Sequence, residues 1–446
     1  MPKKATKKTV KKLTRKKVDT DIDFTSSKLN YADIFGKAVE NAAKKGGSND
    51  VTKFDAGLRS ALVGVPFNNL ALEVCFSESV LGLGRFLCLD GLSGTCKSSI
   101  MWHLCKVIDQ SGGASCVIDT EHKATENLGQ GIVGYDMWPK INFASPETFE
   151  EAMMVVTGMV NLLRKSPHGK TTPLLIGIDS IGGAPTAAEV KKIDKEGTAA
   201  RGYAENALLA ARYINYATSK ISDYPIILVG VRHERIVEGQ YGKTREAKGA
   251  GELGFAAFAT FSLTKVTDHD LAGRAGRQLL IHLKKGTDPG TKVPVTMWWK
   301  EEITPEAESL RHIWFDWEQS AFDLLTTHEN KYLAKRKIAG LKDVLGPMNA
   351  NNKKVICKPL GLTVAAPPAE LCKALYHPDN KKVLDMVRAV LSIRVGQEFK
   401  AGENFDKLKE KQRALILSRR SHEKTNEESS QEDYEENSEE SGEENS

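Results

Sequence analysis

The segment from residue 91 to residue 98 reads Gly-Leu-Ser-Gly-Thr-Cys-Lys-Ser, and its composition suits the binding of phosphate groups. Backbone N–H groups of a glycine-rich loop can surround phosphates, and a helix that begins directly after the loop adds the positive end of its dipole. Within the loop, Lys97 can place a charge beside the β- and γ-phosphates, while the hydroxyl of Ser98 can bind Mg²⁺. The residues expected to hold a nucleotide here are Gly91, Leu92, Ser93, Gly94, Thr95, Cys96, Lys97, Ser98 and Ser99.

Position 96 departs from the usual phosphate-loop pattern, because a cysteine stands where glycine normally precedes the lysine. If the loop needs a positive φ there, Cys96 costs on the order of 1–2 kcal/mol of backbone strain. The pattern alone therefore leaves two interpretations open, a phosphate site and an ordinary turn between a strand and a helix.

Two carboxylates follow apolar segments in the way that a phosphate site requires. Asp179 ends the segment Leu-Leu-Ile-Gly-Ile, and there it can hold the water shell of a bound Mg²⁺. Glu121 follows Val-Ile-Asp-Thr, where a carboxylate can polarise the water that attacks the γ-phosphate in line. Three strand ends that all carry residues suited to one phosphate site arise by chance far less often than a single such strand end. Together they predict a site for ATP and Mg²⁺, with Ser98 and Asp179 as metal ligands and Lys97 and Glu121 in catalysis.

The elements that must position these residues alternate between short β-branched segments and amphipathic helices, from about residue 66 to residue 300. This alternation predicts an α/β fold with a mostly parallel sheet, in which ligands bind at the carboxyl ends of the strands. A helix is expected from Ser145, with Pro146 at its first position. Buried strands are expected at 86–90, 114–119, 174–179 and 226–231, and further strands at 261–266, 278–284 and 293–300.

Composition narrows the class of protein further. No apolar run approaches the roughly 18 residues of a membrane span, and the lysine-rich start lacks the apolar block of a secretory signal. The seven cysteines include no Cys-x-x-Cys pair, which argues against both a structural zinc site and a disulfide framework. These features predict a cytoplasmic protein that has no membrane partner and keeps its cysteines reduced.

The two ends of the chain carry opposite charges. Residues 1–17 contain nine Lys or Arg and no acid, whereas residues 427–446 contain ten Asp or Glu and no base. Segments so dense in like charge bury too little apolar surface to fold, so both ends are expected to be disordered. They can act as solubility tails, or the acidic tail can mimic phosphate and compete with nucleic acid for cationic surfaces.

In order and spacing, four segments of the chain resemble the RecA recombinases. They are Leu83-Gly84-Arg85, the loop at 91–98, Ile118-Asp119-Thr120-Glu121-His122 and Ile178-Asp179-Ser180. The resemblance covers about residues 60–300 and is closest to the UvsX-type recombinases of large tailed phages. It implies a RecA-like P-loop ATPase core with a mostly parallel central sheet, a small N-terminal segment and a mixed C-terminal region. The implied location is the cytoplasm, or the host cytoplasm if a phage encodes the chain.

The activity that this resemblance implies is ATP-dependent DNA strand exchange. A helical filament of the protein on single-stranded DNA would pair that strand with a homologous duplex in recombination and repair, helped by single-strand-binding and mediator proteins. The chain is then expected to divide into a disordered basic arm at 1–30, an N-terminal oligomerisation segment at 31–65, an ATPase core at 66–304, a C-terminal domain at 305–420 and a disordered acidic tail at 421–446.

The resemblance also implies further site residues. His233 takes the place of a catalytic-site residue that senses the γ-phosphate. Lys284 and Lys285 lie near the place of basic residues that reach the ATP of a neighbouring subunit, which would put the ATP at a subunit interface. Two loops, at about 182–198 and 234–251, are implied to bind DNA. Their cations are Lys191, Lys192 and Lys195 in the first loop and Arg235, Lys243, Arg245 and Lys248 in the second.

Three other functions share parts of this pattern. A RecA-fold hexameric DNA helicase has the same phosphate loop and an intersubunit site, but such helicases usually carry a further domain ahead of the core, where this chain has only about 60 residues. A non-catalytic DNA-binding paralogue that assists a recombinase would explain Cys96, although it would have no use for Glu121. In the last alternative the basic arm is the functional part and the core is a scaffold.

Deleting residues 427–446 is expected to strengthen binding to single-stranded DNA by about threefold or more at about 0.1 M salt, because the acidic tail no longer competes for cationic surface. Fluorescence anisotropy of a labelled oligonucleotide, titrated at several salt concentrations, measures the affinity and its salt dependence. A tail of the same length with Asp and Glu replaced by Asn and Gln separates charge from length. Unchanged affinity would reduce the tail to a solubility role.

Overall fold

The structure of the chain is a computed structural model, and it describes residues 62–196, 203–239, 242–247, 253, 256–271, 274–304, 307–326, 340–346, 354–416 and 418. The chain divides into two compact units, Met1–Arg59 and Ser60–Ser446, and every described residue belongs to the second. The expected basic arm and acidic tail lie outside the described residues, as does Lys248. Among the described residues, no helix has both the length and the apolar composition to cross a membrane.

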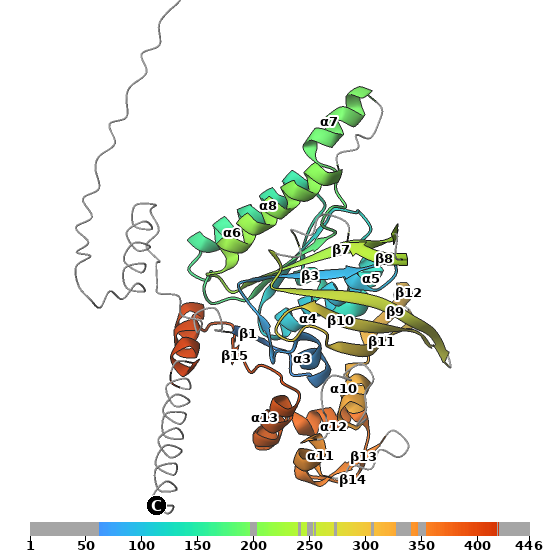
Figure 1. The fold of residues 1–446 in the computed structure, drawn as a ribbon, viewed down its shortest axis with the longest axis vertical. Helices are drawn as coiled ribbons and strands as arrows, with labels where there is room; N and C mark the ends of the chain where they lie inside the picture. Colours follow the sequence, from blue (N-terminus) through green and yellow to red (C-terminus); the bar gives the residue numbers. More distant parts are fainter. Residues whose placement is uncertain are drawn as a thin grey trace, which may run out of the picture. The chain divides into compact units, whose positions relative to one another are not determined.

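One large sheet forms the centre of the second unit (Figure 1). In sheet order its strands are β12 (Ala307–Phe315), β11 (Lys292–Thr304), β10 (Arg274–Lys285), β9 (Ala259–Leu271), β3 (Arg85–Gly91), β7 (Ile226–Gly239), β6 (Leu174–Asp179), β4 (Ala114–Asp119) and β5 (Asn142–Ala144), with β8 (Gly242–Ala247) beside β7. Neighbouring strands are parallel from β9 to β5, whereas β9 to β12 pair antiparallel, as do β7 and β8. The fold is therefore α/β with a mostly parallel sheet, as the alternating sequence pattern predicts.

The strands expected from the sequence are confirmed. β4 and β6 have the expected bounds, β3 is one residue longer at each end, and β7 continues past residue 231 to Gly239. The three later segments lie within β9, β10 and β11. In β3, β4 and β6, almost every residue is buried, and their apolar and β-branched side chains suit strands that are covered on both faces.

The helices that cover the sheet include α4 (Lys97–Gln110), α6 (Phe149–Lys165) and α8 (Tyr203–Ile221). Figure 1 shows α6 and α8 side by side along one side of the sheet. Successive side chains of β3 alternate between two cores, because Leu87 and Leu89 belong to the core beside α4. Phe86 and Cys88 belong to the core beside α6 and α8. This double cover fixes the strand register, since a shift by one residue would exchange the two faces.

The helix expected from the Ser145 cap begins three residues later than predicted, with Phe149 instead of Pro146 at its first position. α6 starts at Phe149, and the Thr148 side chain caps it by accepting a hydrogen bond from the Glu151 N–H at 3.2 Å. The Glu151 carboxylate in turn accepts a hydrogen bond from the Glu147 N–H at 3.0 Å. These two hydrogen bonds satisfy N–H groups at the helix start. The first turn therefore begins after Pro146 and does not include it.

The segments before and after the main sheet are joined to each other. They comprise β1 (Val63–Pro66), α3 (Leu70–Phe76), β2 (Val80–Gly82), α10 (Trp317–Thr326), α11 (Gly340–Leu345), β13 (Val355–Cys357), β14 (Leu362–Ala366), α12 (Pro368–Leu375), α13 (Lys381–Val390) and β15 (Gln397–Glu398). β1 pairs with β2 and with β15 in a small sheet. The buried Glu73 of α3 accepts two hydrogen bonds from Arg388 of α13, of 2.7 and 2.6 Å, and one from the Tyr376 hydroxyl.

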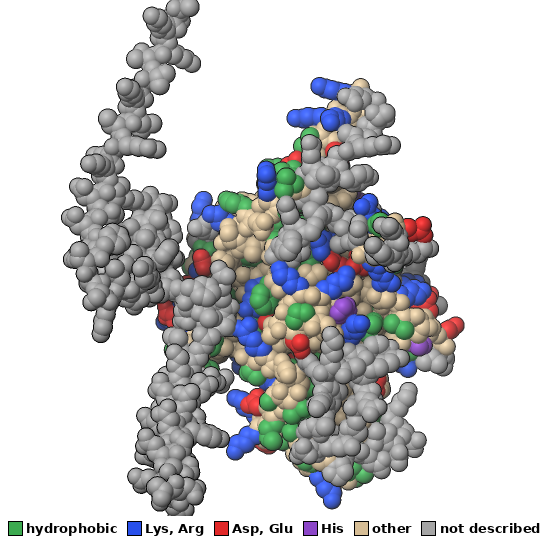
Figure 2. All heavy atoms as spheres, viewed as in Figure 1, with side chains coloured by type: hydrophobic (Ala, Val, Ile, Leu, Met, Phe, Trp, Pro, Cys, Tyr) green, Lys and Arg blue, Asp and Glu red, His purple; other side chains and the backbone are tan. Residues whose placement is uncertain are grey.

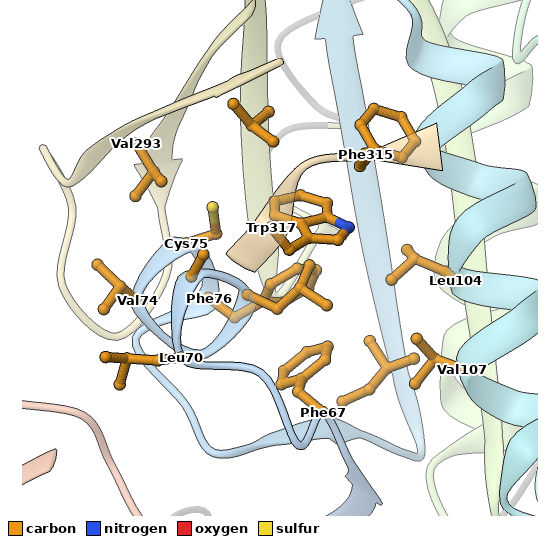
Figure 3. Packing of buried hydrophobic residues seen from close by; sticks show 14 of the residues in the cluster. Phe67, Leu70, Val74, Cys75, Phe76, Leu104, Val107, Val293, Phe315 and Trp317 are labelled. Carbon is orange, nitrogen blue, oxygen red and sulfur yellow. The ribbon is translucent and has the colours of Figure 1, made fainter. Parts of the chain in front are cut away.

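One core also runs through these segments and the main sheet. Figure 3 shows Phe67 and Phe76 near Trp317, with Leu104 of α4 in the same cluster. The expected domain boundary at residue 304 falls between β11 and β12, which pair with each other, so the main sheet continues to Phe315. The reason is local, because β11 and β12 are consecutive strands that pair antiparallel.

A histidine is packed between aromatic rings where this core meets α4. The imidazole of His103 lies 5.5 Å from the ring of Phe315 and 5.5 Å from that of Trp317, measured between centroids. Burial lowers the pKa of His103 to about 3, and the charge of Lys106 adds to the shift. The folded chain therefore holds this imidazole neutral at physiological pH.

Acidification is expected to destabilise the fold through His103. Below about pH 6.5 the unfolded chain binds a proton that the folded chain does not, so the free energy of unfolding falls by about 1.4 kcal/mol per pH unit until the folded pKa is reached. Between pH 7.5 and pH 5.5, the variant His103→Phe should lose about 1.4 kcal/mol less stability than the parent chain, because its ring cannot bind a proton. Urea unfolding at the two pH values measures this, and equal losses would contradict the assignment.

Candidate functional site

The strand ends expected to carry the site lie at one edge of the sheet. β4, β6, β7 and β3 are parallel neighbours, and the register sets Asp119 opposite Asp179. The same register sets Gly91 opposite His233. Glu121 follows Asp119 by two residues, so the phosphate loop, both predicted carboxylates and the predicted histidine start from one edge.

The loop between β3 and α4 is folded around the side chain of Lys97. Its Nζ donates hydrogen bonds to the carbonyl oxygens of Gly91, at 3.0 Å, and Leu92, at 2.8 Å. The hydroxyl of Thr95 donates to the Leu92 carbonyl at 2.8 Å. Glycine is needed at position 91, because a Cβ there would stand 2.5 Å from the Thr95 hydroxyl oxygen. The lysine is therefore held at the place where the sequence expects phosphate.

Helix α4 begins at Lys97, and Cys96 is its N-cap residue with φ 61° and ψ 30°. This left-handed conformation confirms the positive φ considered for position 96, at a cost on the order of 1–2 kcal/mol for a residue with a side chain. Ser98 and Ser99 lie in the first turn, where backbone N–H groups have no acceptor within the helix. Loop, helix start and lysine together have the features of an anion site.

Burial shifts the pKa values of two charged groups at this edge of the sheet. It lowers the pKa of Lys97, and the nearby carboxylates of Asp179 and Glu121 oppose the shift. Burial raises the pKa of Asp179, and the hydrogen bond with Ser98 opposes that shift. Charges held in such surroundings interact strongly, because little water screens them. The site can therefore discriminate between ligands by their charge.

Ser98 and Asp179 also provide the oxygen atoms that Mg²⁺ prefers. In the described part of the chain, no three His, Cys, Asp or Glu side chains gather into a group that could hold a metal ion. Mg²⁺ usually keeps several waters and takes one or two protein ligands together with phosphate oxygens. One hydroxyl and one carboxylate thus fit a magnesium ion that arrives with phosphates.

The carboxylate of Glu121 is held by three side chains. The hydroxyl of Ser180 donates a hydrogen bond to it, Nε2 of His233 lies 2.8 Å from Oε1, and Nζ of Lys123 lies 2.9 Å from Oε2. The contact with His233, followed by those with Ser180 and Lys123, holds the pKa of Glu121 well below its usual range despite burial. Glu121 is therefore an anion at neutral pH and a weak base, which can orient a water molecule through a hydrogen bond.

A cavity of about 600 Å³ opens beside Glu121. Its walls come from the phosphate loop, from the turn after β4, from the turn after β6 and from β7. The lining residues include Ser93, Thr120, Glu121, Lys123, Ser180 and His233. The hydroxyl of Thr120 donates to the Ser180 carbonyl at 2.7 Å and accepts from the Ser180 N–H at 3.0 Å, which ties the two turns together. The arrangement can place a small molecule between the loop and an anionic base.

Lys284 and Lys285 do not join this site within the chain. Nζ of Lys284 lies 2.7 Å from the carboxylate of Glu234, whose side chain is fully buried. Lys285 pairs with Thr260 of β9, which in turn lies opposite Cys88 rather than opposite the end of β3. Burial lowers the pKa of Lys285. Their predicted contact with the nucleotide of a neighbouring subunit stays a prediction.

The first predicted DNA-binding loop is mostly a helix, so the expectation of a loop at 182–198 is wrong. α7 (Ala187–Glu196) carries Lys191, Lys192 and Lys195, all exposed. A capping box explains it, because the Thr186 N–H donates to the Glu189 carboxylate at 2.8 Å while the Thr186 hydroxyl accepts from the Glu189 N–H at 3.3 Å. The sequence Thr-Ala-Ala-Glu carried this signal. Figure 2 shows blue side chains at the end of this helix.

The second predicted loop is a β-hairpin over most of its length. β7 and β8 pair from Glu234 opposite Ala247 to Gly239 opposite Gly242, so the expectation of a flexible loop at 234–251 is wrong for these residues. Arg235 and Arg245 are exposed on the hairpin, and Arg245 donates to the Thr264 hydroxyl at 2.9 Å. Lys243 belongs to β8. The β-branched residues Ile236, Val237 and Thr244 favour strands over an open loop here.

Neither the models of known protein families nor the curated proteins compared with this chain match it. Its function is therefore inferred from the residues and their geometry.

Sequence reasoning missed a buried ion pair directly below the site. Asp90, the residue before Gly91, accepts hydrogen bonds of 2.8 and 2.6 Å from Arg232, the residue before His233. Their side chains are only 3% and 4% exposed. The pair joins the ends of β3 and β7, so it fixes the phosphate loop relative to His233. Charged residues at matching places in two buried strands were the signal.

Replacing Arg232 by Met is expected to lower the free energy of unfolding by about 3–5 kcal/mol, because it leaves the Asp90 carboxylate buried and uncompensated. The double variant Asp90→Asn with Arg232→Met should recover part of the loss. Arg311→Met is the matched control, because its 2.6 Å ion pair with Glu301 is about half exposed and contributes under about 1 kcal/mol. Chemical denaturation measures all three, and equal losses for Arg232→Met and Arg311→Met would contradict the expectation.

Proposed function

We propose that this chain is a DNA-dependent ATPase of the RecA type, a recombinase that forms filaments on single-stranded DNA and pairs it with a homologous duplex. The observation that carries the proposal is the gathering of Lys97, Asp179 and the pair Glu121–His233 at one edge of a parallel sheet. Phosphoryl transfer from ATP to water needs these groups together. A cytoplasmic location and help from single-strand-binding and mediator proteins belong to the same proposal.

The proposed hydrolysis assigns a separate task to each residue. Lys97 would exchange its bonds to the loop carbonyls for phosphate oxygens, and Ser98 and Asp179 would hold the metal ion. When bound, Mg²⁺ supplies positive charge beside the β- and γ-phosphates. Glu121, already an anion, would accept a hydrogen bond from the attacking water and orient it. Oε1 already contacts Ser180 and His233, so the water would either bind Oε2 beside Lys123 or displace one of these partners.

The same geometry supports coupling between DNA and hydrolysis. β7 carries His233 and, two residues further, Arg235, so a force on the hairpin reaches the histidine directly. α7 follows the turn that begins at Ser180, whose hydroxyl also binds Glu121. On the face seen in Figure 2, Lys and Arg side chains gather over β7 and β9, where DNA phosphates would be attracted. Both cationic elements therefore lead to the carboxylate that orients water.

Hydrolysis of ATP is expected to be slow alone and to rise about tenfold or more with single-stranded DNA, because DNA contacts on α7 or the hairpin would release Glu121 from its partners. The variants Lys97→Ala and Glu121→Gln should each lower the stimulated rate by about 100-fold or more. Lys106→Ala, on the same helix as Lys97, is the control for removal of a lysine. Release of inorganic phosphate measures the rates, and a rate indifferent to DNA would contradict the coupling.

Electron microscopy with single-stranded DNA and a slowly hydrolysed ATP analogue separates the alternatives. Helical filaments support the recombinase, whereas closed six-membered rings would support a RecA-fold hexameric helicase instead. Filaments formed by a chain that never hydrolyses ATP would support the non-catalytic paralogue. The presence of Glu121 in the wall of the cavity favours an active ATPase over that last alternative, because a pure binder has no use for a carboxylate that orients water.

A further inference from the structure

An arginine from the antiparallel half of the sheet reaches the phosphate loop. Nη1 of Arg277, in β10, donates a hydrogen bond to the carbonyl oxygen of Gly94 at 2.8 Å. Nε of the same guanidinium donates to the carboxylate of Asp268 at 2.8 Å, and Asp268 is the residue opposite Arg277 in β9. Lys265 donates to the other oxygen of that carboxylate. The loop is thus tied to the β9–β10 hairpin.

The arginine is held in place from more than one side. Its side chain is 26% exposed, and the centre of the guanidinium lies 5.9 Å from the ring of Trp299 in β11. Asp268 holds the Nε edge of the guanidinium while Nη1 contacts the loop. A planar guanidinium restrained in this way loses little conformational freedom when it makes a further hydrogen bond.

The bond to Gly94 sets the direction of the next backbone N–H. In a planar trans peptide the carbonyl of Gly94 and the N–H of Thr95 point to opposite sides. Because Arg277 holds the carbonyl on the hairpin side, the Thr95 N–H is turned the other way. That orientation is the one in which a loop N–H can point into the anion site.

The loop needs this restraint because of Cys96. Gly94 has φ 74° and Cys96 has φ 61°, so two left-handed residues flank Thr95. Glycine adopts such angles readily, whereas a residue with a Cβ is strained there. The thiol of Cys96 also lies near Arg277, whose charge opposes the rise that burial causes in the pKa of Cys96. The strained residue and the arginine therefore act on the same turn.

We infer that Arg277 is a positioning residue that holds the phosphate loop in its anion-binding conformation and compensates for the strain at Cys96. This inference rests on the proposed ATP site at residues 91–98. It assigns to the β9–β10 hairpin a contribution to nucleotide binding within one chain, separate from any contact between subunits.

Nucleotide titrations with five variants test the inference. The probe is an ATP analogue with a fluorescent group on the ribose, in the presence of Mg²⁺. Arg277→Gln should weaken binding of the probe, and raise KM for ATP, by about tenfold with kcat changed less than about twofold, as expected for one charge-assisted hydrogen bond. Arg277→Lys should recover part of the loss. Arg274→Gln, on the same strand but with its guanidinium over Trp298 at 4.3 Å, is the matched control and should bind like the parent chain.

The role assigned to Cys96 is tested in a double-variant cycle. Cys96→Gly relieves the strain, so in that background Arg277→Gln should weaken binding by less than about threefold. Equal losses in both backgrounds would overturn the compensation, and unchanged affinity in Arg277→Gln would overturn the positioning role. A chain that does not bind the probe at all, with a normal circular dichroism spectrum and thermal transition, would refute the proposed ATP site and this inference with it. If the parent chain binds the probe normally, a failed prediction for Arg277→Gln contradicts the positioning role and leaves the proposed ATP site standing.

Discussion

The parallel register of β4, β6, β7 and β3 is the constraint on which the site depends. Backbone hydrogen bonds between these strands set Asp119 opposite Asp179 and Gly91 opposite His233, so their carboxyl ends finish at one level. Two cores, one on each face, hold that register because a one-residue slip would send apolar side chains to the wrong face. Backbone pairing therefore sets the geometry of the site, because it places the starting points of its side chains close together.

Two sets of charged side chains lie at this edge of the sheet. Asp90 and Arg232 form a buried ion pair between the ends of β3 and β7, so their opposite charges compensate each other. Above it, Lys97 is held by loop carbonyls, and Glu121 is held by a hydroxyl, an imidazole and an ammonium group. The partners of Glu121 can exchange for water, because Ser180, His233 and Lys123 line the cavity. A fixed lower pair and an exchangeable upper set suit a site that must bind and release an anion.

The cationic elements are continuations of the site rather than separate modules. β7 runs without a break from the buried strand into the hairpin that carries Arg235, and α7 starts shortly after the turn at Ser180. Rigid elements of this kind transmit a displacement better than open loops do, because their backbone hydrogen bonds resist bending. The hairpin β9–β10 makes a third such connection through Arg277 and the Gly94 carbonyl.

The strands, the order of the site residues along them and the strained position at Cys96 can all be predicted from the sequence, because each depends on local pattern and spacing. The sequence also contained the capping box at Thr186, although the resemblance to the RecA recombinases implied a loop there. Three features became visible in the folded chain alone. Arg277 donates a hydrogen bond to Gly94, Arg232 pairs with Asp90, and the chain past residue 304 continues in the main sheet. Those contacts join residues far apart in the chain, and they depend on which strands become neighbours, which no local pattern specifies.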